Sequence, residues 1–92
     1  MNRSEVEAFI GKRVIVKFLY GNEHEKNRVY RYFIARIRRI EDDDEVVFAK
    51  EEWVDTKRDL GVEGEQLMVR RILYIAECPR SQQREVIVGA ML

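Results

Sequence analysis

Arginines and tyrosines alternate along the stretch "RVYRYFIARIRRI", residues 28–40. If this run forms a β-strand, its even positions share one face of the sheet. The aromatic and basic residues on that face would include Tyr30, Tyr32, Arg36 and Arg38. Nucleic-acid-binding sheets use such a face, because rings stack on bases while guanidinium groups hold phosphates. The alternative is a solvated strand face whose arginines pair with neighbouring carboxylates.

The charge of the chain changes sign after this run. Residues 26–40 carry six basic side chains and no acidic one, whereas residues 41–55 carry eight acidic side chains and one basic. If the two blocks form a hairpin, Glu51, Glu52 and Asp55 can neutralise much of the positive charge. If the opposite charges lie on different edges instead, they attract a second copy of the chain. Head-to-tail contacts of that kind generate rings when the rotation closes.

No pattern in the sequence is typical of a catalytic or metal site. His24 is the single histidine and lies in a polar loop, and Cys78 has no second cysteine or histidine near it in sequence. The acidic run at residues 41–45, "EDDDE", lacks the alternating ligands and turn glycine of a calcium loop. A solvated hairpin tip is the better interpretation of this run. We therefore expect no enzyme activity, no cofactor and no small-molecule substrate.

The composition bounds the class of protein. The 92 residues suffice for one domain with its own core, and the formal net charge of zero argues against a generally basic nucleic-acid binder. A single cysteine fits a reducing compartment. The apolar runs are too short for a membrane span, and the first residues lack the apolar block of a signal peptide. We expect a soluble, cytoplasmic protein that does not associate with membranes.

The order of elements predicts a mostly β domain over residues 1–92. Ser4 and Glu7 have the spacing of a capping box, and Gly11 ends the helix expected over residues 1–11. Five or six short strands with polar turns follow, which is typical of a small antiparallel β-barrel. A strand of about twelve residues would span some 40 Å if straight, so the long run must curl around the core, and the small side chain of Ala35 favours a bend there.

The last apolar segment, "EVIVGAML", is predicted to be an extra strand after a turn, within residues 79–92. Its alternate positions Val86, Val88 and Ala90 are apolar, and so is Ile87 on the opposite face. A strand that is apolar on both faces is an aggregation hazard unless it is paired or covered. It either pairs with another copy of the chain or closes its own barrel.

Two adjacent arginines, Arg70 and Arg71, interrupt the apolar run "LMVRRILYIAE". Neighbouring residues of a strand point to opposite faces, so a continuous strand would place one of the two charges in the core. Either the strand bends at this point, or one arginine is aimed at a ligand.

These motifs resemble the Sm-like (LSm) proteins. "GKRVIVKFLYG" is similar to the family's first strand, with Val14 and Val16 alternating before Gly21, and "MVRRILYI" resembles its motif of an apolar residue, an arginine and an apolar strand. The resemblance implies an SH3-like barrel of five to six strands that forms homo-oligomeric rings and binds RNA. It also implies that Arg70 lies at a sharp turn between the last two strands and points toward RNA bases.

The sequence departs from the family pattern at several positions of the RNA site. Glu45 stands where the family has an asparagine that contacts a base, and Arg71 stands where it has a glycine. An acidic Glu45 would repel an RNA chain. Two functions therefore remain open: an RNA-associated ring protein, or a protein-interaction module on the same barrel without nucleic-acid binding. The candidate RNA-binding residues are Arg70, Arg71, Glu45, Tyr30, Tyr32, Arg36 and Arg38.

Overall fold

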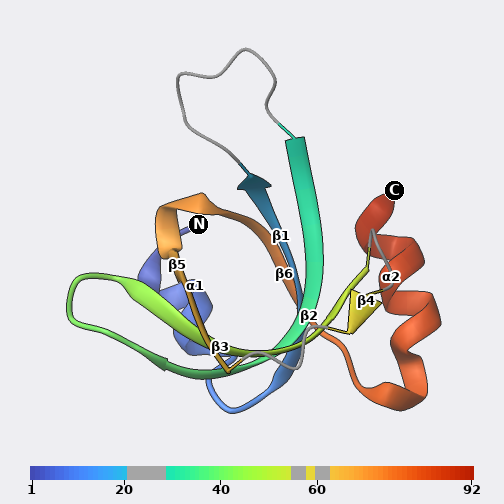
Figure 1. Cartoon of the computed structure of the whole chain (residues 1–92), viewed down its shortest axis with the longest axis horizontal. Helices are drawn as coiled ribbons and strands as arrows, with labels where there is room; N and C mark the ends of the chain where they lie inside the picture. Colours follow the sequence, from blue (N-terminus) through green and yellow to red (C-terminus); the bar gives the residue numbers. More distant parts are fainter. Residues whose placement is uncertain (21–28, 55–57, 60–62) are drawn as a thin grey trace.

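The computed structural model describes residues 1–20, 29–54, 58–59 and 63–92, so Gly21, His24 and Asp55 lie outside the described residues. The helices and strands in chain order are α1 (Arg3–Glu7), β1 (Arg13–Tyr20), β2 (Val29–Ile40), β3 (Glu45–Trp53), β4 (Arg58–Asp59), β5 (Glu63–Met68), the 3-10 turn η1 (Val69–Arg71), β6 (Ile72–Glu77), the 3-10 turn η2 (Arg80–Gln82) and α2 (Gln83–Met91) (Figure 1). Neither α-helix in this part of the chain is long and apolar enough to cross a membrane.

The strands form one antiparallel sheet, which confirms the mostly β prediction. Its order is β4-β3-β2-β1-β6, and β5 pairs with another part of β3. The predicted closed barrel is wrong. Within the described ranges β5 pairs only with β3 and β6 only with β1, so the sheet curves but does not close. The turn η1 carries the chain across the gap between these two outer strands (Figure 1).

The long strand β2 bends where its pairing with β3 is irregular. The register shifts at Ile34/Ala35, where Glu51 is the extra residue of β3, and again at Ile37/Arg39, where Arg38 is the extra residue of β2. Such β-bulges increase the local twist and bend the strand that carries them. Figure 1 shows β2 curved along its length, so the expectation that the long run curls around the core is confirmed, whereas the extra residue next to Ala35 lies in the partner strand β3.

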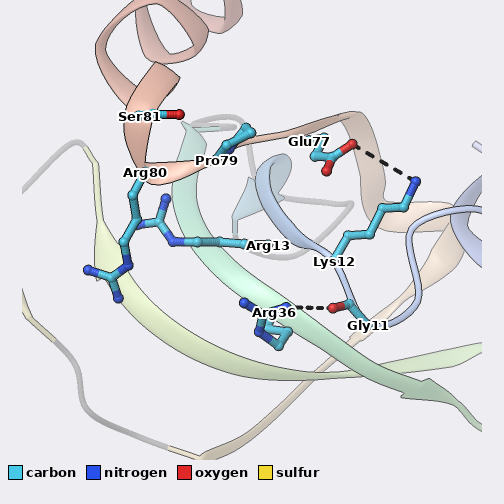
Figure 2. Close-up of a pocket in the computed structure, with 8 residues that line it drawn as sticks. All are labelled: Gly11, Lys12, Arg13, Arg36, Glu77, Pro79, Arg80 and Ser81. Carbon is cyan, nitrogen blue, oxygen red and sulfur yellow. Dashed lines mark hydrogen bonds and ion pairs between the residues drawn. The ribbon is translucent and has the colours of Figure 1, made fainter.

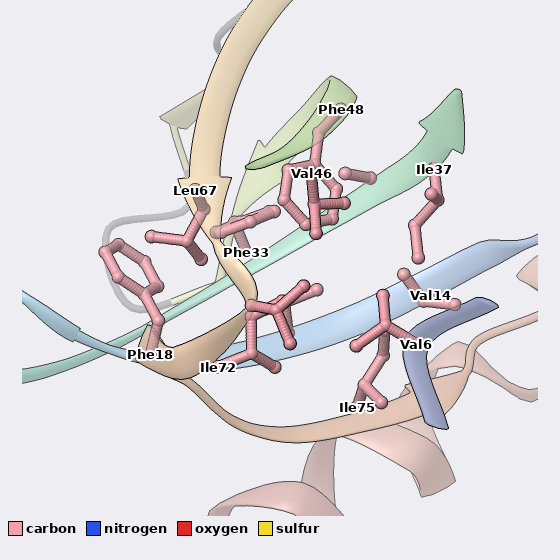
Figure 3. Packing of buried hydrophobic residues seen from close by; sticks show 13 residues of the cluster. Val6, Val14, Phe18, Phe33, Ile37, Val46, Phe48, Leu67, Ile72 and Ile75 are labelled. Carbon is pink, nitrogen blue, oxygen red and sulfur yellow. The ribbon is translucent and has the colours of Figure 1, made fainter. Parts of the chain in front are cut away.

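The inner, concave face of the sheet holds the main hydrophobic core (Figure 3). Odd positions of β2 supply Phe33, Ala35 and Ile37, on the face opposite the even positions that carry the basic and aromatic residues. The Phe33 ring packs edge-on against Phe48, with centroids 5.1 Å apart, and against Phe18 at 5.4 Å. The other buried members of this cluster are Val6, Val14, Val16, Val46, Leu67, Val69, Ile72 and Ile75.

The helix α1 packs on this inner face through Val6, which is fully buried. Its N-terminus is capped two residues earlier than predicted. The Asn2 side chain accepts a hydrogen bond from the Glu5 backbone N–H at 3.0 Å, and the Glu5 carboxylate accepts one from the Asn2 N–H at 3.3 Å. This is a capping box, formed by Asn2 and Glu5 rather than by Ser4 and Glu7. The chain then turns and leaves at Gly11, whose φ of 80° favours glycine.

The C-terminal segment is a helix, so the predicted extra strand at residues 79–92 is wrong. In α2 the half-buried side chains are Gln83, Val86, Ile87 and Ala90, whose spacing places them on one helical face. The apolar members of this face cover Ile15, Ile34 and Cys78 on the outer face of the sheet. Burial of a helical face against β1 and β2 has overridden the strand preference of the β-branched residues. Figure 1 shows α2 outside the curve of the sheet, on the side away from α1.

Candidate nucleic-acid interface

The two adjacent arginines lie on the turn between the outer strands. The chain leaves the strand conformation at Val69–Arg71 and forms the 3-10 turn η1. Val69 is buried in the inner core, and its N–H donates to the Asp44 carbonyl at 2.9 Å, which ties the turn to the β2–β3 hairpin. Because the strand stops here, neither arginine has to enter the core.

Arg70 and Arg71 have different environments on this turn. The Arg71 side chain is half-buried, and its Nη2 donates to the Leu19 carbonyl at 2.7 Å. Arg70 is exposed and makes no hydrogen bond or ion pair with any described residue. It lines a small surface cavity that is otherwise formed by Met1, Asn2, Arg3, Asp44, Met68 and Val69. Arg71 therefore braces the turn against β1, and Arg70 is the arginine that remains available to a ligand.

Glu45 begins β3 opposite Met68, next to the turn. Its carboxylate is half-buried, and the Gln66 side-chain amide, with its nitrogen turned toward Glu45, donates to both oxygens at 3.1 Å. Glu45 thus has a neutral partner and does not neutralise Arg70. Its acidic charge nevertheless stays on the same edge of the sheet as the turn, so it lowers the attraction of this edge for a polyanion.

Tyr30 and Tyr32 project from the outer face of β2 and flank a lysine that the sequence analysis did not single out. Lys17 of β1 lies opposite Tyr32, and its Nζ is 5.0 Å from the centroid of the Tyr30 ring and 5.6 Å from that of Tyr32. On the other side of β1, Tyr74 of β6 lies opposite the same lysine. We call these four residues, Lys17, Tyr30, Tyr32 and Tyr74, the tyrosine surface.

The tyrosine surface is open to solvent. Tyr30 retains 53% of its accessible surface and Tyr74 retains 40%. A cation over the face of a ring is attracted by its quadrupole, and this attraction holds Lys17 between the tyrosines of β2. Exposed rings around one cation can stack on bases while the ammonium group contacts a phosphate. Alternation along each strand could have indicated that Lys17 and Tyr74 lie on an exposed face. Their position next to each other depends on β1 lying between β2 and β6.

Arg36 and Arg38 do not belong to the tyrosine surface. Arg36 lies opposite Arg13 at the far end of β1, and its Nη1 donates to the Gly11 carbonyl at 2.5 Å. Arg38 is exposed at the second β-bulge. The helix α2 covers Ile34 between these arginines and the tyrosines. The single lateral face predicted for Tyr30, Tyr32, Arg36 and Arg38 is thus divided by α2 into two separate regions.

A polar network under α2 was not predicted from the sequence. The Arg13 guanidinium donates to Glu51 Oε2 at 2.7 Å, to the Cys78 carbonyl at 2.7 Å and to Gln83 Oε1 at 2.8 Å. Gln83 in turn donates to Glu52 Oε2 at 3.4 Å. Burial raises the pKa of the Cys78 thiol, and the nearby Arg13 charge opposes that rise. The signal in the sequence was Ile15, an apolar residue on the same strand face as Lys17, because such a residue is expected to be covered.

The acidic hairpin tip agrees with its interpretation as a solvated turn. Asp42, Asp43 and Asp44 are exposed, and the Asp44 N–H donates to the Glu41 carbonyl at 3.0 Å to close the turn. Arg3 Nη1 lies 2.9 Å from the Asp44 carboxylate. In the described part of the chain, no three His, Cys, Asp or Glu side chains lie close enough to hold a metal ion.

No protein-family model, curated protein or solved structure matches this chain.

Proposed function

We propose that this chain is a non-catalytic, RNA-associated protein of the Sm-like type that assembles through its two outer strands. The observation that carries the proposal is the segment β5–η1–β6. Two strands that are unpaired on their outer sides in the described structure are joined by a turn that presents the exposed Arg70. The resemblance of this segment to the Sm-like motif implies the same position for the arginine.

The outer edge of β6 supports assembly by strand pairing. The Cys78 N–H donates to the Arg13 carbonyl at 2.8 Å, which continues the pairing of β6 with β1. Because amide groups alternate in direction along an antiparallel pair, the N–H groups of Ile75 and Glu77 point away from β1. An edge of unpaired amides is a template for another strand. Pairing of β6 with β5 of a second copy is head-to-tail, and it forms a ring where the rotation closes.

Assembly would gather copies of Arg70 near one another. Arginines held close together raise the local potential and attract polyanions even when the whole chain has a net charge of zero. The tyrosine surface offers a second contact, in which bases stack on exposed rings. RNA is the ligand that fits both chemistries, since it combines phosphates with unstacked bases.

A pair of variants tests the assembly. Glu77→Pro removes an outward N–H of β6, whereas Glu77→Ala keeps it and removes only the side chain. We expect the wild-type chain to be oligomeric by light scattering, and we expect Glu77→Pro to lower the mass while Glu77→Ala does not. Circular dichroism verifies that both variants are folded. A monomeric wild-type protein, or equal masses for two folded variants, would contradict assembly through β6.

A second pair tests the RNA contact. Arg70→Ala should weaken binding of labelled oligo-U by more than tenfold, on the order of 1.4 kcal/mol or more, and should leave fold and mass unchanged. The matched control is Arg84→Ala on α2, which removes an equally exposed arginine with no partner among the described residues. If the wild-type protein assembles but binds no oligo-U at low salt, the chain is instead an assembly module without nucleic-acid binding.

A further inference from the structure

A cavity on the far side of α2 from the tyrosine surface has basic side chains in half of its lining residues. Its volume is about 510 Å³, and its walls come from the turn before β1, from β2 and from the segment between β6 and α2 (Figure 2). The lining residues are Gly11, Lys12, Arg13, Arg36, Glu77, Pro79, Arg80 and Ser81. Four of these eight carry a positive charge and one carries a negative charge.

The four basic side chains differ in how many of their donors already form hydrogen bonds within the fold. Arg13 is committed to the network under α2, because its three guanidinium nitrogens already donate to Glu51, Cys78 and Gln83. Arg36 is exposed, and among the described residues it contacts only the Gly11 carbonyl, through one of its nitrogens. Arg36 therefore retains unused donors in the lining of the cavity.

Lys12 and Arg80 are the other available donors. The Lys12 ammonium lies 3.9 Å from the Glu77 carboxylate, beyond hydrogen-bonding distance, and both side chains are about half exposed. Arg80 Nη2 lies 3.4 Å from Glu51 Oε2, and 79% of the Arg80 side chain is exposed. Exposed pairs at such distances are weak and exchange readily for a better acceptor. The Ser81 hydroxyl adds a neutral donor on the same wall.

We propose that this cavity binds a phosphate group, held between Arg36 and Arg80 with Lys12 beside it. Two guanidinium groups and an ammonium group on three segments present donors from several directions, which suits an ion with oxygens on all sides. The ion pair of the buried Arg13 with the half-buried Glu51 ties β1 to β3 next to the cavity, so this part of the backbone is already ordered before an ion enters. The site is separate from Arg70 and does not depend on assembly or on RNA binding.

The first test uses inorganic phosphate and the amide resonances of the full chain. Phosphate is titrated against chloride at equal ionic strength, and shifts are expected at Gly11, Lys12, Arg80 and Ser81, with saturation in the millimolar range. Arg36→Gln and Arg80→Gln should each weaken phosphate binding at least about fivefold, which corresponds to roughly 1 kcal/mol. Arg84→Gln is the matched control and should leave the affinity unchanged.

A variant that is expected to bind phosphate more tightly separates an effect on the site from a general loss of stability. Glu77→Gln takes away the one carboxylate of the lining and releases Lys12, so phosphate should bind more tightly. Thermal melts verify that every variant is folded. The proposal is overturned if phosphate causes no more shift at these amides than chloride does. It is also overturned if Arg36→Gln and Arg80→Gln bind phosphate as the control does.

The source of the phosphate is distinguished in a third arm. Uridine 5′-monophosphate, oligo-U with a 5′-phosphate and oligo-U with a 5′-hydroxyl are compared in the wild type and in Arg36→Gln. Loss of affinity in Arg36→Gln confined to the 5′-phosphorylated oligomer assigns the site to an RNA end. Equal losses for the mononucleotide and inorganic phosphate assign it to a free phosphorylated compound. A 5′-hydroxyl oligomer that is as sensitive to Arg36→Gln as the phosphorylated one assigns the site to internal phosphodiesters.

Discussion

The Arg13 guanidinium lies 2.7 Å from the Glu51 carboxylate, and only 8% of the Arg13 side chain is exposed. The β-bulge at Glu51 makes this pair possible. The extra residue in β3 allows two consecutive glutamates, Glu51 and Glu52, to reach the outer face of the sheet, where a regular strand would send one of them inward. Arg13 bonds the first glutamate, and Gln83 of α2 bonds the second.

Removal of this arginine should destabilise the whole domain. Arg13→Ala leaves the Glu51 carboxylate and the Cys78 carbonyl without their charged donor in a largely buried place, and we expect a loss of about 3 kcal/mol in the free energy of unfolding. Arg39→Ala is the control, because Arg39 pairs with Glu41 at an exposed site and its loss should cost about 1 kcal/mol or less. Urea unfolding measures both, and equal losses would contradict a structural role for the Arg13 network.

Cys78 should be protected from alkylation. The residue is fully buried beneath α2, and burial raises the pKa of its thiol, so the reactive thiolate is scarce in the folded state. Iodoacetamide should modify the native protein on the order of a hundredfold more slowly than the urea-unfolded protein, the factor that a local opening of about 2.8 kcal/mol imposes. A native rate close to the unfolded rate would show that α2 does not cover the thiol.

The same thiol predicts a pH dependence of stability. Because the pKa is raised in the folded state, the unfolded chain releases its proton first as the pH rises. Below the ordinary thiol pKa of about 8.5 both states keep the proton, so the thiol does not make the free energy of unfolding depend on pH. Above this pH the free energy of unfolding should fall. Cys78→Ala should remove this part of the slope between about pH 8 and 10, and identical slopes for the two proteins would contradict the prediction.

Two glycines should respond in opposite directions to alanine. Gly89 lies within α2, and a Cβ placed there meets no atom within 4 Å, so Gly89→Ala should raise the free energy of unfolding by about 0.5–1 kcal/mol. Gly11 has a φ of 80°, so Gly11→Ala should lower stability by about 1 kcal/mol. A loss of stability in Gly89→Ala would contradict the uncrowded helical position of Gly89. Thermal or urea unfolding of the two variants decides.

The sequence predicted the elements whose hydrophobic period is unambiguous. The apolar positions of β2 and the hairpin tip at residues 41–45 followed from alternation and turn residues, and the break at Arg70 was one of the two alternatives that the misplaced charge left open. The helix α2 was missed because Val86, Val88 and Ala90 fit a period of two, while Gln83, Val86, Ile87 and Ala90 fit the helical period equally well.

The choice between a strand and a helix for this segment depends on what packs against the outer face of the sheet. That packing is a tertiary property, which the local sequence pattern does not contain. Ile15 and Ile34 are apolar residues on the outer face of the sheet, and side chains of α2 pack against them. The same packing of α2 explains why the predicted basic and aromatic face is divided. The pairing of Lys17 with tyrosines on both neighbouring strands also required the strand order, which alternation along one strand does not contain.

The tyrosine surface supplies the last prediction. Tyr30 and Tyr74 are exposed rings on either side of β1, so under the RNA proposal each should stack on a base, an interaction worth roughly 1–3 kcal/mol. Tyr30→Leu and Tyr74→Leu keep an apolar side chain and remove the ring. Each should weaken oligo-U binding by about tenfold, or 1.4 kcal/mol, with little change in stability. Leu73→Ala, on the same strand as Tyr74 and similarly exposed, is the control.

Salt dependence separates the stacking of these rings from the phosphate binding of Arg70. Stacking releases no counterions, so the tyrosine variants should shift the plot of affinity against salt without changing its slope, whereas Arg70→Ala should reduce the slope by about one for each phosphate that the arginine neutralises. Filter binding or fluorescence anisotropy at several salt concentrations provides both quantities. Tyrosine variants that bind oligo-U as the Leu73→Ala control does would contradict stacking on these rings, and RNA binding would then depend on Arg70 alone.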